Sequence, residues 1–377
     1  MSSQAQTFDH AVIGAGPAGI TAVANLLDRG VSSIAWVDPD FCVGRLGARY
    51  RTVPDNTRAQ LFQDYFQALP SVRGLLDHPA VAPAWQRLAE LGPGDRGPLG
   101  VVCDVLQGLT EALRERTDAR AARVTALEHR DDGWRVSLDD GSEVQARCVV
   151  LATGAVPAEL PLPGLEGPRP LPLDVALDPE CLRDQDLGGA RAAVIGNSHS
   201  AVLVLKNLVE LPAPPVEVLH VFRRPLIYAE YLDGWIRHDD TGLKGAAADW
   251  AREHLERVPH PLIRPLHLRP GDEPSLSQAL EGCGHIVQAV GFTPAPLPVI
   301  RFGQREFDGA AIGYDDRCGQ LLAPDGRELP GLFGLGIAFP QGEHDREGRF
   351  ERRVGLWKFM RYAREVGAPL WMDFSRR

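Results

Sequence analysis

The sequence predicts an α/β protein built on two strand–turn–helix units, each with small residues in its turn. In the first unit, the apolar run at residues 10–13 leads directly into the glycine-rich turn at residues 14–19, and residues 20–29 continue at helical spacing. In the second unit, residues 191–195 form a strand before a turn that begins at Gly196, and an apolar helix follows. Two such units indicate two nucleotide-type folds in one chain.

Composition and charge narrow the class of protein. The 377 residues are 44% apolar and 24% charged, as expected for a folded globular chain. The formal net charge of −10 argues against a nucleic-acid binder, because such proteins need a surplus of positive charge. The sequence contains no run of about 18 apolar residues, so it predicts no membrane helix. The six cysteines are scattered without a Cys-x-x-Cys pair, so we expect a cytoplasmic protein with no metal site.

The first turn has the order of a dinucleotide site. Gly14 makes the tight turn, Gly16 lets the backbone approach a pyrophosphate, and Gly19 lets the helix pack closely on the strand. The phosphates would lie at the helix N-terminus, where free N–H groups favour an anion. The next strand, residues 34–37, ends at Asp38, which is placed to bind ribose hydroxyls. The expected contacts are Gly14, Gly16, Pro17, Ala18, Gly19 and Asp38.

Residues 123–150 predict a β-meander. Apolar residues alternate along this stretch, and Asp-Asp-Gly sequences at residues 131–133 and 139–141 are typical of hairpin turns. Val124, at the start of the meander, is a further candidate cofactor contact.

Three more segments, together with the first turn, resemble the superfamily of FAD-dependent flavoproteins with two dinucleotide-binding domains, which includes the pyridine-nucleotide-disulfide reductases and the flavin monooxygenases. Residues 148–154 match its Ala-Thr-Gly signature, residues 286–292 resemble the returning strand, and residues 332–338 resemble the last FAD strand. In that last strand Ile337 stands where the family usually has aspartate.

The resemblance implies a fold and a cofactor. We expect a three-layer ββα FAD-binding Rossmann-like domain at residues 1–158 and 287–377, with a smaller NAD(P)H-type α/β domain inserted at residues 159–286. The further FAD contacts that it implies are Gly44, Arg45, Thr153, Gly154, Gly336 and Ile337.

The second turn departs from the glycine pattern. Ser198 replaces the second glycine and Ala201 the third, whereas Arg223 and Arg224 follow the next strand and suit the 2′-phosphate of NADPH. We expect NADPH to bind at Gly196, Ser198, Ala201, Arg223 and Arg224. The alternative is a domain that packs but binds no nucleotide. His199 is either a polar residue at a helix start or a contact to nicotinamide or substrate.

Two polar segments admit two interpretations each. Residues 228–250 interleave aromatic and polar side chains, which suits either a substrate-facing loop or a loop that fills the domain seam. Residues 342–353 are highly charged and predict a solvated loop or a lid.

The remaining motifs select the chemistry. Without paired cysteines, the disulfide-reductase branch is rejected. Residues 50–57 resemble a flavin monooxygenase segment, which makes Asn56 the catalytic candidate beside His199, although a turn role next to Pro54 is equally compatible. A Phe-x-Gly-x-x-x-His run typical of those enzymes is missing, and residues 184–189 stand in its place.

We therefore expect an FAD enzyme that takes hydride from NADPH and reacts with oxygen to monooxygenate a small organic substrate. The alternatives are an FAD oxidase or dehydrogenase that oxidises its substrate directly without NADPH, and a non-catalytic flavin-binding redox sensor. The sequence leaves the oligomeric state open.

Overall fold

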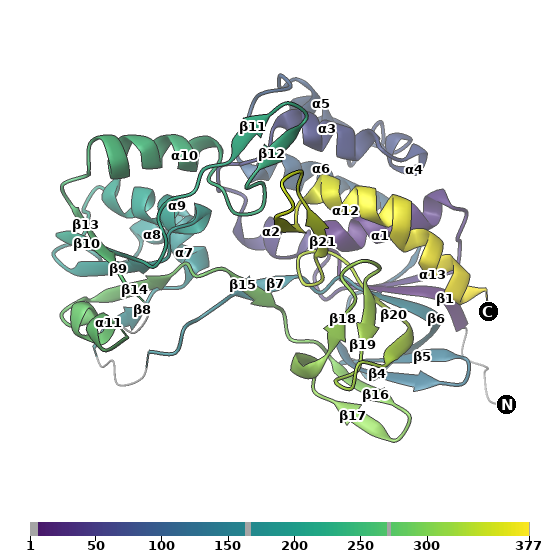
Figure 1. Cartoon of the computed structure of the whole chain (residues 1–377). Coiled ribbons are helices and arrows are strands. Elements are labelled where there is room, and N and C mark those ends of the chain that lie inside the picture. Colours follow the sequence, from purple (N-terminus) through teal and green to yellow (C-terminus); the bar gives the residue numbers. More distant parts are fainter. Residues whose placement is uncertain (1–6, 163–166, 270–272, 377) are drawn as a thin grey trace.

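Two β-sheets, each with its own helices, organise the chain (Figure 1). The computed structural model describes residues 7–162, 167–269 and 273–376. We call the described residues between 158 and 291, which include the smaller sheet with α7–α11 and the hairpin β11–β12, the smaller lobe, and the rest of the described chain the larger lobe. No helix among the described residues is long and apolar enough to cross a membrane.

The larger sheet combines a parallel sheet with the predicted meander. Its main path runs β17-β16-β4-β5-β6-β1-β2-β3, and β20, β19 and β18 branch from β6. The nine-residue strand β6 is shared, because Glu143–Ala146 pairs with β5 and Val149–Leu151 pairs with β20, while its other edge pairs with β1. The bounds are β1 (Thr7–Ile13), β2 (Ile34–Val37), β3 (Asp118–Arg120), β4 (Val124–Arg130), β5 (Gly133–Leu138), β6 (Glu143–Leu151), β16 (Val299–Phe302), β17 (Arg305–Phe307), β18 (Gly313–Tyr314), β19 (Gln320–Leu322) and β20 (Glu328–Gly334).

Alternating side chains of the parallel strands face two separate cores. Val12 and Val150 pack among the helices, whereas Ala11 and Leu151 pack against the meander. This is the predicted ββα arrangement in three layers. The helices of the larger lobe are α1 (Pro17–Asp28), α2 (Gly44–Arg49), α3 (Ala59–Gln67), α4 (Pro70–Arg73), α5 (Ala82–Ala89), α6 (Leu99–Arg114), η2 (Gly309–Ala311), α12 (Leu356–Tyr362), η3 (Ala363–Gly367) and α13 (Ala368–Ser375).

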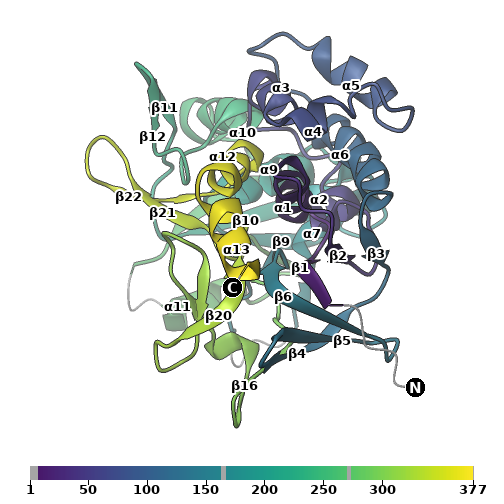
Figure 2. The same ribbon diagram turned by 90° about the vertical axis from the view of Figure 1, so that its right-hand side faces the viewer.

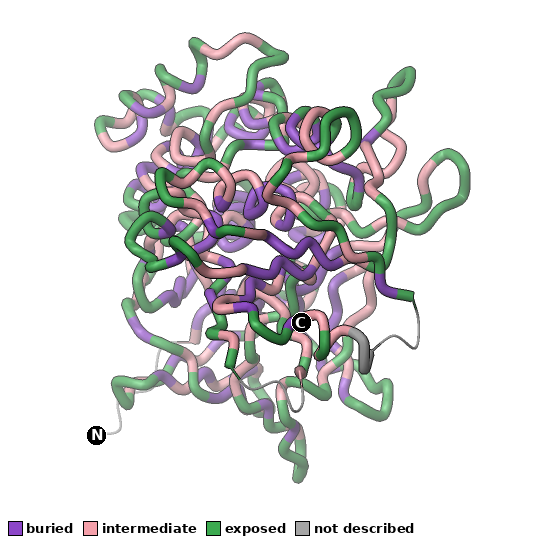
Figure 3. The backbone as a smooth tube through the Cα atoms, turned by 90° about the vertical axis from the view of Figure 1, so that its left-hand side faces the viewer, coloured by how far each residue is buried: buried purple, intermediate pink, exposed green. Residues whose placement is uncertain are grey.

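The smaller sheet is parallel throughout, in the order β13-β10-β9-β14-β8. Val194 and Val218 face the core under α9 and α10, and Ile195 and Leu219 face the core under α11. Figure 3 views this lobe from outside, with buried residues through its middle and exposed residues in its loops. Its elements are α7 (Leu173–Leu177), β8 (Arg169–Pro170), α8 (Pro179–Arg183), β9 (Arg191–Ile195), α9 (His199–Val209), β10 (Glu217–Phe222), α10 (Gly245–Ala251), η1 (Arg252–Arg257), β13 (Ile263–His267), α11 (Glu273–Leu280) and β14 (His285–Gln288).

Two short antiparallel strands carry the chain between the lobes, β7 (Ala155–Pro157) and β15 (Phe292–Pro294). The predicted domain boundaries stay predictions. Sheet pairing favours moving the one between residues 286 and 287 beyond Gln288, because β14 is hydrogen bonded as a whole within the smaller sheet.

Each lobe also projects a hairpin toward the other. In the smaller lobe, β11 (Glu230–Leu232) and β12 (Trp235–Arg237) lie between β10 and α10, and in the larger lobe β21 (Gln341–His344) and β22 (Phe350–Arg353) lie between β20 and α12. Figure 2 shows both hairpins on the same side of the molecule.

Candidate functional site

Gly14 and Gly19 are glycines that the fold itself requires. Gly14 has φ +109°, its N–H donates to the carbonyl of Val37 at 2.7 Å, and a Cβ there would lie 2.4 Å from the carbonyl oxygen of Ala152. A Cβ on Gly19 would lie 1.9 Å from the carbonyl oxygen of Gly14. Backbone atoms therefore leave no room for a side chain at either position.

Gly16 differs because the protein leaves space beside it. The nearest atoms to a Cβ there would be 3.9 Å away. Gly16 precedes α1 without a side-chain cap, and Pro17 follows as the first helical residue. The helix N-terminus is thus uncapped by the protein, as an anion site requires.

Two other segments meet this helix end through glycines. A Cβ on Gly44, which has φ +57°, would lie 3.1 Å from Cα of Gly16. A Cβ on Gly336, which has φ +97°, would lie 2.6 Å from Cβ of Ala18. These glycines, which we call the cradle (Gly16, Gly44 and Gly336), keep bulk away from the helix end and fit the pyrophosphate of a dinucleotide. Ile337 follows with 38% exposure in place of the usual aspartate.

Asp38 is buried against the turn and accepts three backbone hydrogen bonds. One carboxylate oxygen accepts from the N–H of Ala15 at 2.7 Å, and the other accepts from Asp40 and Phe41 at 2.9 and 2.7 Å. The sequence did not predict that hydrogen bonds of Asp38 join the glycine turn to the loop after β2. A carboxylate can accept further bonds, so the ribose contact stays a prediction.

The signature at the end of β6 has a polar atom with no partner. The hydroxyl of Thr153 is buried and has no hydrogen-bond partner among the described residues. Gly154, with φ +74°, accepts from the N–H of Ala295 at 3.0 Å, which holds the two interlobe strands together. Val124 begins β4 shortly after Arg120, whose carbonyl accepts from the N–H of Asp38.

Arg45 and Asn56 form contacts within the protein, and the cofactor contact of Arg45 stays a prediction. The guanidinium of Arg45 forms an ion pair with Asp174 of the smaller lobe and donates to the hydroxyl of Tyr50 at 3.1 Å. Asn56 is exposed, and its side-chain oxygen accepts from the hydroxyl of Thr57 at 3.2 Å. This geometry favours the turn interpretation of Asn56. The catalytic role remains a prediction.

The carboxyl group of Asp55, next to Asn56, is unusual in its burial and in its pKa. Asp55 is 6% exposed, and burial raises its pKa to about 7, against the opposing effects of the Thr57 N–H and of the charge of Arg96. No sequence signal marked Asp55, because its burial depends on packing against residues 95–98, where Gly97 accepts its N–H at 2.7 Å.

The second turn reproduces the first. Gly196 has φ +138°, its N–H donates to the carbonyl of Val221 at 2.9 Å, and a Cβ there would lie 2.2 Å from the carbonyl oxygen of Ala289. Ala201 is fully buried at the position that corresponds to Gly19. Ser198 is exposed, has a negative φ of −111°, and does not cap α9 with its side chain. The two replacements therefore leave the turn intact and the helix end uncapped.

Arg223 and Arg224 lie exposed directly after β10. Neither guanidinium forms a hydrogen bond or ion pair within the part of the chain that the structure describes, although the carbonyl of Arg224 accepts from the side chain of Asn197 at 2.8 Å. A cavity of about 260 Å³ lies next to them, lined by Asn197, His220, Phe222, Pro225, Leu226 and residues of η1.

His199 begins α9 and contacts Lys244, which lies at the junction of the lobes. Burial and the charge of Lys244 lower the pKa of His199 to about 4, against a backbone hydrogen bond to Lys244, so the ring is neutral at physiological pH. Lys244 pairs with Asp239, which also contacts Lys358 of α12 in the larger lobe. The contact of His199 to nicotinamide or substrate stays a prediction.

Neither a metal-ligand cluster nor a disulfide is found among the described residues. The described residues contain no group of three or more His, Cys, Asp or Glu side chains suited to a metal ion. All six cysteines are free thiols. Burial raises the pKa of Cys148, and it raises that of Cys103 to about 11, so neither becomes a thiolate at neutral pH.

Two sheets, each with a glycine turn and an uncapped helix at the carboxyl end of one strand, β1 or β9, define a flavoprotein-type fold with two dinucleotide-binding units. Residues 8–238 match the family described as pyridine nucleotide-disulphide oxidoreductase. The chain belongs to this family, and the predicted resemblance and fold are confirmed.

A relative spans nearly the whole chain. Monooxygenase AgnR1 of Paecilomyces divaricatus is 39% identical over 389 residues, which cover 96% of this chain and 97% of the relative. The chain is therefore a monooxygenase-like oxidoreductase.

Solved structures share the fold over the whole length. A double variant of the flavin monooxygenase from Stenotrophomonas maltophilia matches with a TM-score of 0.59 at 19% identity, over 98% of this chain and 99% of that chain. The FAD-bound form 1 of OTEMO matches with a TM-score of 0.61 at 15% identity, over the same shares of both chains.

Proposed function

We propose that the chain is an FAD-dependent monooxygenase that takes hydride from NADPH and acts on a small organic substrate. The observation that carries the proposal is the equivalence of the two turns, at Gly14 and at Gly196, each of which leaves a helix end open. The full-length monooxygenase relative supports the oxygen chemistry.

The larger lobe suits FAD. FAD, when bound, supplies the redox and oxygen chemistry, and the protein supplies binding, orientation and exclusion of water. The cradle admits the pyrophosphate at the N-terminus of α1, and Asp38 lies beside the turn for the adenosine ribose. The buried, unpartnered hydroxyl of Thr153 is free to donate to a bound group.

The smaller lobe suits NADPH. Ser198 presents a free hydroxyl and backbone N–H at the start of α9, where a pyrophosphate would lie. Arg223 and Arg224 offer guanidinium groups for the 2′-phosphate that have no partner among residues 7–162, 167–269 and 273–376, and the adjoining cavity of about 260 Å³ is mostly apolar, as an adenine ring requires. Burial lowers the pKa of His220 in this cavity to about 4, so its ring adds no charge there.

An anaerobic titration of the FAD-loaded protein tests the proposal. NADPH should bleach the visible flavin absorption, and NADH should do so only at much higher concentration. In Arg223→Ala and Arg224→Ala the Kd for NADPH should rise about 10- to 100-fold, because each charge-assisted hydrogen bond contributes about 1.5–3 kcal/mol. The Kd for NADH should stay unchanged.

Arg183→Ala serves as the matched control, since Arg183 is an exposed arginine of the same lobe on α8. A yellow protein that neither nucleotide bleaches would contradict NADPH use and favour an oxidase or dehydrogenase that reacts with its substrate directly. A protein that takes up no FAD would overturn the proposal as a whole.

A further inference from the structure

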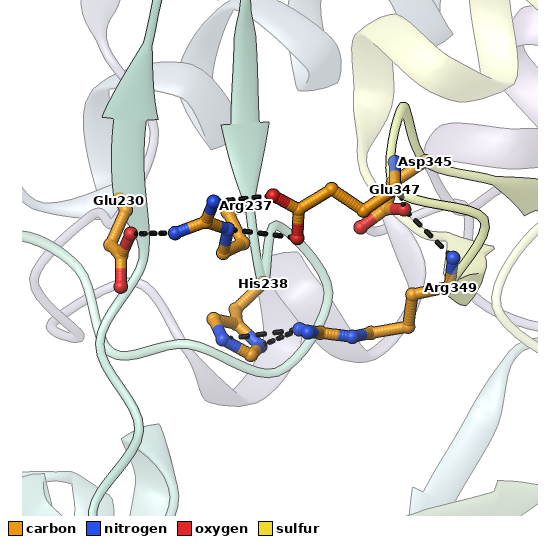
Figure 4. A network of polar contacts seen from close by, with 6 residues as sticks. All are labelled: Glu230, Arg237, His238, Asp345, Glu347 and Arg349. Carbon is orange, nitrogen blue, oxygen red and sulfur yellow. Dashed lines mark hydrogen bonds and ion pairs between the residues drawn. The ribbon is translucent and has the colours of Figure 1, made fainter.

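Four consecutive residues at the end of the β11–β12 hairpin all contact the other lobe. The guanidinium of Arg237 pairs with Glu347, with Nε donating to Oε2 at 3.0 Å, and also with Glu230 of its own hairpin at 2.5 Å. The ring of His238 contacts the guanidinium of Arg349 (Figure 4). We call residues 230–240 together with residues 341–353 the clasp.

The next two residues continue the series. The N–H of Asp239 donates to Glu351 at 3.0 Å, and a carboxylate oxygen of Asp240 accepts from the N–H of Arg352 at 3.2 Å. The carboxylate of Asp239 lies between two ammonium groups, Lys358 at 2.5 Å and Lys244. Four successive residues thus meet four partners on the β21–β22 hairpin, and Asp239 also meets Lys358 on α12.

Asp239 and its two ammonium partners are less solvated than the two acids that pair with Arg237. The side chains of Asp239, Lys244 and Lys358 are 20%, 13% and 26% exposed, whereas Glu230 and Glu347 are 51% and 42% exposed. Burial acts to raise the pKa of Asp239, but the charges of Lys358 and Lys244 outweigh it and hold that pKa below its usual value. The carboxylate is therefore charged at neutral pH and paired across the seam.

The clasp links the two cofactor turns. The β21–β22 hairpin begins shortly after Gly336 of the cradle and ends just before α12. On the other side, Lys244 holds Asp239 through its ammonium group and contacts His199, which follows Ser198 of the second turn. A displacement of Asp239 would therefore be transmitted to both sites.

Ion pairs of this kind suit orientation better than stability. Exposed pairs contribute little to the free energy of folding. Arg237 and Asp239 carry opposite charges and face partners of opposite sign, Glu347 and Lys358, so a shift that set Asp239 against Glu347 would bring like charges together. The clasp fixes how the lobes sit on each other.

We propose that Asp239 is a positioning residue that, through Lys358 and Lys244, holds the smaller lobe in the orientation needed for hydride transfer from NADPH to FAD. The inference rests on the proposed function. Asp239 lies in neither of the two glycine turns and acts through its contacts to Lys358 and Lys244.

Stopped-flow reduction of the FAD-loaded protein under anaerobic conditions tests this role. In Asp239→Asn, the rate constant for flavin reduction at saturating NADPH should fall about 10- to 100-fold, because small displacements of reacting groups cost rates of this order. The Kd for NADPH and the reduction of the flavin by dithionite should not change. If the substitution only disturbed folding, the flavin content would fall, and the rate constant, the Kd for NADPH and the reduction by dithionite would all change.

Asp325→Asn is the matched control. Asp325 also pairs with two cations, Arg305 and Arg327, but all three lie in the larger lobe. Its rate of flavin reduction should equal that of the unchanged protein.

A charge exchange keeps the test independent of one variant. Arg237→Glu and Glu347→Arg should each slow reduction, and the double variant should recover part of the rate, because the exchange restores the pair between the lobes but sets like charges against Glu230. Wild-type rates in Asp239→Asn, or a raised Kd for NADPH with an unchanged rate constant, would overturn the inference. If the unchanged protein is not reduced by NADPH at all, the proposed function fails instead.

Discussion

Asp55 shows how far one residue's chemistry depends on contacts that are distant in sequence. The segment at residues 50–57 predicted Asn56 as the functional side chain, yet Asn56 is exposed and Asp55 is buried. Nothing in the local pattern distinguishes the two, since both are common turn residues. The burial of Asp55 arises where the chain crosses residues 95–98.

A pH dependence of stability follows from Asp55. Burial raises its pKa from 3.8 to about 7, so the folded state favours the protonated carboxyl. Its stabilising effect is complete below about pH 4 and is lost as the pH rises to about 7, which lowers the free energy of unfolding by up to about 4 kcal/mol. Urea unfolding of Asp55→Asn should lack this loss, because the amide keeps an acceptor for the Thr57 N–H and cannot ionise. Equal pH profiles for both proteins would contradict the prediction.

At the scale of the element, the two strand–turn–helix units were predictable because their signal is local. A short apolar run, a tight turn and a helix are adjacent in sequence, so the residues 14–19 and 196–201 could be placed correctly. What could not be predicted is that Ala201 fits where the first unit needs Gly19. That fit depends on how closely α9 and α1 pack against their strands. The packing distance is set by side chains elsewhere in the sequence.

The glycines of the first turn should separate folding from cofactor binding. Gly16→Ala places its Cβ 3.9 Å from Gly44 and Val43, an ordinary contact distance, so the thermal stability of the apoprotein should change little while FAD affinity falls at least about 10-fold. Gly19→Ala drives its Cβ into the carbonyl of Gly14 and should lower both stability and FAD affinity. Gly94→Ala, with nothing within 4 Å of its Cβ, is the control. Flavin fluorescence titration and thermal unfolding measure the two effects, and tight FAD binding by Gly16→Ala would count against the cradle.

At the scale of the whole molecule, the order of the segments was predictable and the seam between the lobes was not. The first turn, the meander, the second turn and the last strand appear in the expected sequence in the structure. The seam includes polar pairs between residues more than 100 positions apart, such as Arg45 with Asp174 and Arg237 with Glu347, beside the packing of Tyr50 and Val53 on the core of the smaller lobe. Charged segments without apolar periodicity look the same in sequence whether they face solvent or a neighbouring lobe. Residues 342–353 could therefore be assigned only as a loop or a lid.

The seam has a second attachment, at some distance along the chain from the clasp. Asp174 of α7 accepts from the hydroxyl of Tyr50 at 2.7 Å and pairs with Arg45, both from the larger lobe. Its side chain is 14% exposed. If this contact and the clasp hold the same relative orientation of the lobes, they must be coupled, although ion pairs with no shared partner normally act independently.

A double-mutant cycle on flavin reduction tests that coupling. Asp174→Asn and Asp239→Asn should each slow reduction by NADPH, and the double variant should be slower than either single variant but by less than the product of the two factors. The reason is that the first substitution already loosens the relative orientation of the lobes. The second substitution then has less fixed orientation left to disturb. Glu217→Gln, which weakens the Arg191–Glu217 pair inside the smaller lobe, should combine multiplicatively with Asp239→Asn. Strict multiplicativity for Asp174 and Asp239 as well would mean that the two contacts act on separate features, and that the lobes are not held as one unit.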